Sequence, residues 1–160
     1  MRFLTYVLLS FPLVSFAAPD SVTQTITGLT QTKAVGVQWE LGKQLIGDIN
    51  CDGQKDYVIK GRSKGRIYIA VILGPLSESS RVEVLNFGVG EEKYQNSLLE
   101  KDPQVRFVPL NYEPKELLGS ELEGYHPSKD CNGVEIGGEE SDEINLYWNH
   151  KMNGISWWRL

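Results

Sequence analysis

Seven short segments rich in Val, Ile, Tyr, Phe and Trp recur along this 160-residue chain, and most are bounded by Gly, Pro, Asn or Ser. Such residues favour extended backbone, and such boundaries favour tight turns. The expected strands are 36–41, 56–60, 66–73, 81–87, 105–110, 143–148 and 155–160. This pattern predicts a mainly β fold, a small antiparallel sheet or sandwich.

Two hairpin turns are indicated by glycine. The stretch KGRSKGR at 60–66 predicts a turn in which Gly61 and Gly65 take positive φ. Asn153-Gly154 predicts the turn of the last hairpin, because this dipeptide suits the left-handed backbone that such turns need.

Helix signals are weak and point to one or two short helices. Residues 92–101 could form one before Pro103, and 114–124 could add a turn or two. Gly119 weakens the second, because glycine disfavours helix interiors.

The N-terminus is typical of an export signal. Arg2 precedes an uncharged apolar run at 3–16, and small residues up to Ala17 fit a cleavage site. An anchoring transmembrane helix is the alternative, but the run is shorter than the roughly 20 residues a span needs. We therefore expect 1–17 to be a signal peptide and 18–160 to be a single compact β-rich domain, periplasmic or secreted, with no further membrane span.

Two cysteines remain in that domain, Cys51 and Cys131. An even pair in an exported chain most often forms a disulfide, and two free buried thiols are the alternative. Loss of Arg2 with the signal leaves 15 basic against 21 acidic residues, a net charge of −6. Nucleic acid and anionic lipid are poor partners for such an acidic domain.

The stretch DINCDGQKD places oxygen-bearing side chains at positions 1, 3, 5 and 9, with glycine at position 6. The expected ligands are the side chains of Asp48, Asn50, Asp52 and Asp56, together with the backbone carbonyl of Gln54. Ca²⁺ prefers six to eight hard oxygen ligands, and crowded carboxylates repel one another without a cation. The spacing favours a structural Ca²⁺ over Mg²⁺, and the alternative is a polar turn satisfied by its own backbone.

DxNxDGxxD leading directly into a strand resembles the calcium loops of FG-GAP and VCBS-type repeats. The loop departs from an EF-hand, because position 12 is Ile59 and a strand follows instead of a helix. The resemblance covers 45–74 in a single copy, and it implies that Asp56 binds the ion directly. The whole chain is also similar to small exported bacterial proteins that carry this loop type.

Other polar residues offer weaker indications. His126 and His150 lie outside any metal motif, so surface or turn positions are expected. The acidic stretch 138–143 predicts a solvated loop, or else a weak second cation site. Asp130 and Asn132 flank Cys131, so the expected disulfide could bring them to the calcium loop.

Four aromatic residues gather on the last predicted hairpin: Tyr147, Trp148, Trp157 and Trp158. Neighbouring strand residues point to opposite faces, so Trp157 and Trp158 cannot share one. Either a helix or loop covers the outer face, or one tryptophan is exposed. Exposed tryptophan is common at surfaces that bind proteins or sugars, although core packing is the more frequent use.

These features leave two classes of function. The first is an exported calcium-binding module that binds an extracytoplasmic protein or glycan, as an inhibitor or protective partner in the cell envelope. The second is a hydrolase that acts on cell-wall or glycan substrates, for which paired carboxylates would be needed. The first is preferred, because the sequence carries no GxSxG, HExxH or phosphate-loop motif.

Overall fold

The computed structural model describes residues 20–90, 96–138 and 142–160. The predicted signal peptide at 1–17 lies outside the described residues. So do the first residues of the expected helix at 92–101 and the middle of the acidic stretch 138–143. Among the described residues, no helix is both long and apolar enough to cross a membrane.

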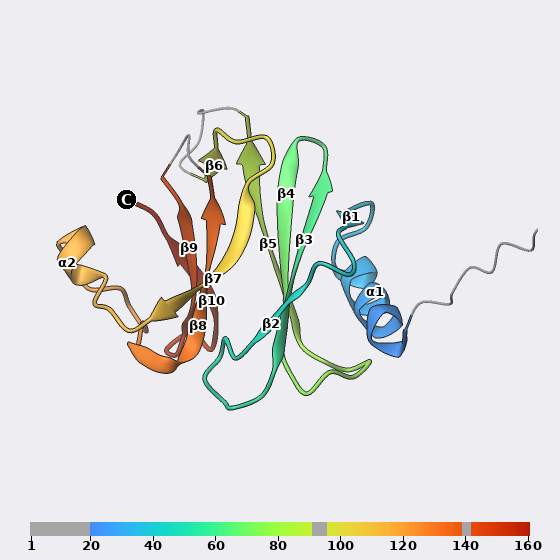
Figure 1. Cartoon of the computed structure of the whole chain (residues 1–160), viewed down its shortest axis with the longest axis horizontal. Helices are drawn as coiled ribbons and strands as arrows, with labels where there is room; N and C mark the ends of the chain where they lie inside the picture. The colour runs from blue at the N-terminus through green and yellow to red at the C-terminus, as the bar shows by residue number, and fades with distance from the viewer. Residues whose placement is uncertain (1–19, 91–95, 139–141) are drawn as a thin grey trace, which may run out of the picture.

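Two β-sheets form the body of the molecule, as Figure 1 shows. The first contains β1 (Gln38–Trp39), β2 (Leu45–Gly47), β3 (Asp56–Ser63), β4 (Arg66–Ile72), β5 (Val82–Val89) and β6 (Ser97–Leu98). Its order is β1-β3-β4-β5-β6, and β2 also pairs with β3. The second contains β7 (Gln104–Leu110), β8 (Ser128–Gly137), β9 (Ile144–Asn149) and β10 (Gly154–Trp158), in the order β10-β9-β8-β7. Neighbouring strands are antiparallel except for the parallel pair β5 and β6.

The main core lies between the two sheets, so the predicted β-sandwich is confirmed. Along β4, Ile67, Ile69 and Val71 face the second sheet, whereas Ala70 and Ile72 face the opposite side. This alternation follows from the two-residue period of a strand. The second sheet contributes Val134, Ile136, Ile144 and Leu146 to the same core.

The outer face of the first sheet is covered by α1 (Ser21–Lys33), which the sequence did not predict. Threonine is a weak helix former because its branched side chain loses freedom. Here the Asp20 carboxylate caps the helix by accepting the Thr23 amide at 2.7 Å, and the Thr30 hydroxyl donates to the Ile26 carbonyl at 2.8 Å. The helix packs through Ile26 onto a cluster that contains Ile59, Ala70, Ile72 and Val82. Tertiary packing therefore outweighs the weak local preference.

The outer face of the second sheet is covered by residues 111–127, which we call the cover segment. It contains α2 (Lys115–Leu118), which ends at Gly119 with φ 72°, so the expected helix at 114–124 is only four residues long. The Tyr125 hydroxyl donates to the carbonyls of Leu110 and Tyr112 at 3.1 Å each, and burial raises the pKa of this phenol. The chain is thus layered as cover segment, sheet, sheet and α1 (Figure 1).

Several local predictions were wrong in detail. In the described part of 92–101, residues 97–98 form β6 and no helix is present. Gly61 lies inside β3 opposite Tyr68, and the two turn residues with positive φ are Lys64 and Gly65. A glycine is needed at 61 because a Cβ there would overlap the side chains of Val37 and Trp39.

Candidate functional site

The 48–56 loop connects β2 to β3 at one end of the first sheet. Gly47 and Asp56 are paired across the hairpin, so the loop begins and ends at one place. Cys51 and Gly53 have φ of 64° and 81°, and these left-handed residues fold the chain back on itself. Gly53, at position 6 of the stretch, therefore has a backbone conformation that glycine adopts more readily than other residues.

Asp56 is fully buried and ties the loop to the rest of the sheet. Its Oδ2 accepts the amides of Ile49 at 2.8 Å and Asn50 at 3.3 Å, and its Oδ1 accepts the amide of Gly74 at 2.8 Å. Burial raises the pKa of this carboxyl, the three amides oppose that rise, and the charge of Asp52 adds to it. The Asp56 side chain thus links the connection between β2 and β3 to the connection between β4 and β5.

The other predicted ligands accept hydrogen bonds within the loop. Asp48 accepts the amides of Cys51 at 2.7 Å and Gly53 at 2.8 Å, one on each oxygen. The Asn50 side chain accepts the Asp52 amide at 3.1 Å and donates to the Asp52 carboxylate at 2.9 Å. Asp52 also accepts the amide of Gln54 at 2.8 Å. These are Asx-type contacts, which the polar-turn alternative also predicts.

The donor set fits a hard cation in its chemistry. A carboxylate oxygen has more than one lone pair, so one amide bond on each oxygen of Asp48 leaves capacity for a metal. In the part of the chain that the structure describes, however, no three His, Cys, Asp or Glu side chains are grouped as metal ligands. Ion binding would therefore require the carboxylates of the loop to gather more closely than they do here.

The predicted disulfide between Cys51 and Cys131 is present, with 5.3 Å between the Cα atoms. It joins the loop to β8 in the second sheet, and the Asn132 amide donates to the Asp48 carbonyl at 2.8 Å beside it. Asn132 therefore lies against the loop, as its position next to the cysteine predicted. Asp130 is exposed, and its amide bonds the Ser128 hydroxyl at 3.1 Å.

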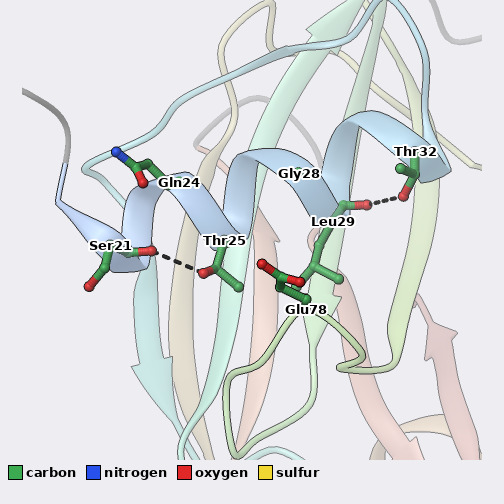
Figure 2. A pocket seen from close by; sticks show the side chains of 7 residues that line it. All are labelled: Ser21, Gln24, Thr25, Gly28, Leu29, Thr32 and Glu78. Atoms are coloured by element: carbon green, nitrogen blue, oxygen red, sulfur yellow. Dashed lines mark hydrogen bonds between the residues drawn. The ribbon is translucent and has the colours of Figure 1, made fainter.

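Two larger hollows lie near the first sheet, besides one of about 120 Å³ that is lined in part by Glu40 and Lys60. One of about 370 Å³ is bordered by Asn50 and Asp52 and by the serine-rich connection between β4 and β5. The other, of about 540 Å³, runs along α1, where Figure 2 shows Glu78 reaching toward the helix. Its lining residues are Ser21, Gln24, Thr25, Gly28, Leu29, Thr32 and Glu78. The hydroxyls of Thr25 and Thr32 donate to helix carbonyls.

The four aromatic residues of the last hairpin lie on its two faces, as the strand period predicted. Trp157 is 38% exposed and meets the edge of Phe87, with ring centroids 6.0 Å apart. Tyr147, Trp148 and Trp158 are buried. The cover segment lies over Tyr147 and Trp158, so the loop-covered alternative holds for that face. Trp157 is the member of the four that offers surface to a partner.

One arrangement was invisible in the sequence. His126 and His150 stack on each other, with ring centroids 4.4 Å apart and planes inclined by 15°. No local pattern could indicate this contact, because it depends on how the cover segment meets the turn between β9 and β10.

No family model, no curated protein and no solved structure matches this chain. The resemblance to FG-GAP and VCBS-type loops therefore depends on the loop residues and the strand that follows them. The fold and the loop define a disulfide-linked β-sandwich with an acidic, oxygen-rich connection between β2 and β3.

Proposed function

We propose that this chain is an exported calcium-binding β domain that acts as a binding module in the cell envelope, as an inhibitor or protective partner of another extracytoplasmic component. The observation that carries the calcium part is the concentration of Asp48, Asn50, Asp52 and Asp56 on one hairpin loop. The disulfide supports the compartment, because such bonds persist mainly in oxidising environments.

A binding role is favoured over hydrolysis by the way the described acids are distributed. Glycoside hydrolysis generally needs two carboxylates that face one bond. Three hollows lined by described residues carry one carboxylate each, Asp52, Glu78 or Glu40. Trp157, partly exposed beside Phe87, is the better candidate for contact with a protein or glycan.

Calcium binding is tested by thermal unfolding of metal-stripped protein. A ligand that binds only the folded state raises its stability by about 2.7 kcal/mol at a hundredfold excess over Kd. In a domain of this size that corresponds to a rise in Tm of roughly 5 °C or more. Asp52→Asn should abolish the rise, whereas Asp130→Asn, which removes an exposed carboxylate outside the loop, should preserve it. An unchanged Tm of the wild type in millimolar Ca²⁺ would contradict the proposal.

The binding role is tested by affinity capture from the native cell envelope. The wild type should retain a partner that Trp157→Ala loses, because this substitution removes the exposed ring of the hairpin. Equal recovery by Trp157→Ala would show that the hairpin is not the contact surface, and recovery of nothing by the wild type would contradict the binding role itself.

A further inference from the structure

The two histidines of the chain lie on different segments, and their rings contact each other. His126 lies at the end of the cover segment and is exposed, whereas His150 begins the turn between β9 and β10 and is half-buried. Their nearly parallel rings are packed face to face. Neutral imidazoles can stack in this way, but two imidazolium ions at this separation repel each other.

Backbone and side-chain contacts hold the same end of the cover segment on β9. The His150 amide donates to the Gly124 carbonyl at 2.9 Å. The Tyr147 hydroxyl and the Asn149 side chain both donate to the Glu123 carbonyl, at 3.1 and 2.8 Å. Gly124 has φ 70°, and a Cβ there would overlap the Asn149 side chain. The histidines therefore belong to a close contact between two segments.

The charged groups at this contact already have partners. The Glu123 carboxylate pairs with the Lys151 ammonium across the same two segments. Glu121, on the cover segment, pairs with Lys115 of α2. The hydroxyls of Tyr125 and Tyr147 donate to backbone carbonyls of this part of the chain. Protonation of the imidazoles thus adds positive charge beside an ion pair that is already neutral overall.

Release of this contact would uncover aromatic surface. Tyr125, next to His126, packs against Tyr147 with ring centroids 5.5 Å apart. Trp158 is buried in the same cluster, and it meets Tyr112 of the cover segment. The cover segment therefore separates these rings from solvent only while it stays docked on the second sheet.

We propose that the stacked pair of His126 and His150 is an acid-sensitive latch, which holds the cover segment over the aromatic face of the second sheet when neutral and releases it when protonated. Burial, and then the charge of His126, lower the pKa of His150 below its ordinary value. The docked state therefore binds fewer protons than the released state, whose imidazoles titrate near pH 6.5. Docking is fully stable above that pH and weakens as the pH falls through the lowered pKa of His150. For each unit by which the pKa of His150 is lowered, full protonation increases the ratio of released to docked protein by up to about tenfold.

The latch is tested first by NMR titration of the two imidazoles. Each of the two histidines gives one Hε1 and one Hδ2 ring-proton signal, and single variants assign these signals. His126→Asn removes one of the two charges at an exposed position, so the pKa of His150 should rise toward its ordinary value. An unchanged pKa of His150 in His126→Asn would contradict electrostatic coupling between the rings.

Hydrogen exchange measured by mass spectrometry then tests release itself. After correction for the intrinsic pH dependence of exchange, protection of 119–127 should fall at least about fivefold between pH 7.5 and 5, while β4 stays protected. His126→Asn should reduce this response, and His150→Asn should lose most of it, because burial is the larger cause of the lowered pKa of His150. Glu123→Gln should keep the response, because it removes the neighbouring ion pair and leaves both imidazoles. Equal protection at both pH values, a uniform loss over all strands, or a full response in His126→Asn would overturn the proposal.

Discussion

Removal of the Cys51–Cys131 disulfide should be strongly destabilising although it leaves the core between the two sheets intact. The bond joins residues 80 apart, and the closed loop contains β3 to β7 and the start of β8. In the chain-entropy description, a cross-link over a loop of this length stabilises the folded state by about 4.5 kcal/mol. With typical stabilities of about 5–15 kcal/mol for a domain, this is a large fraction of the total.

Most of this stabilisation arises because the disulfide restricts the unfolded chain. Without the bond it expands, so the dependence of the free energy of unfolding on urea should become steeper. Cys131 is also buried among the outer aromatic cluster, and loss of its sulfur adds a small packing cost. A loss of about 4.5 kcal/mol corresponds to a fall in Tm of roughly 10–15 °C for this size.

The assay is urea unfolding in the presence of a chelator, followed by circular dichroism. The Cys51→Ala/Cys131→Ala variant and the chemically reduced wild type should lose similar stability. Ser128→Ala is the matched control, because the Ser128 hydroxyl donates to the Cys131 sulfur at 3.1 Å without being part of the bond. A loss below about 1 kcal/mol with an unchanged urea dependence would refute the chain-entropy reasoning for this protein.

Three further outcomes are expected. Asp56→Ala in chelator should lower the free energy of unfolding by about 3 kcal/mol, because three amides lose a buried acceptor; unchanged urea unfolding would mean that Asp56 serves only a metal. Gly61→Ala should lower it by about 1–3 kcal/mol by forcing β1 away from β3, and a smaller loss than in Gly65→Ala, where only φ is strained, would contradict this. Overall stability should fall as the pH decreases below about 6.5, because the folded pKa of His150 is lowered, and His150→Asn should flatten that decline in thermal scans at several pH values.

The sequence predicted the strands whose residues alternate between two buried faces or end at strong turns. It missed β8, because SKDCNGVEIG contains an Asn-Gly pair that favours a turn. In the structure β8 pairs with β7 on one side and β9 on the other, and the disulfide fixes it to the loop. These non-local contacts outweigh the local turn preference.

The loop shows the same division between local and non-local information. The sequence predicted the pairing of Cys51 with Cys131 and placed a glycine at position 6, and the structure gives Gly53 a positive φ. The spacing could not reveal that Asp56 accepts the amide of Gly74, because that contact depends on the pairing of β3 with β4. For the same reason, the sequence identified oxygen donors but could not tell whether they bond to amides or gather around an ion.

The two outer covers are the least locally specified parts of the fold, and this has a consequence for function. Both sheets have a second apolar face, and each face is buried by a segment with weak intrinsic structure, α1 on one side and the cover segment on the other. Segments held by tertiary contacts alone open at lower free energy than paired central strands. α1 lies on a cluster whose buried members are aliphatic, whereas the cover segment lies on buried tyrosine and tryptophan and reaches the stacked pair of histidines. Protonation of the two histidines therefore acts on the cover segment, whose release would expose tyrosine and tryptophan on the hairpin face opposite Trp157. Aromatic surface of this kind is what a binding module presents to its partner.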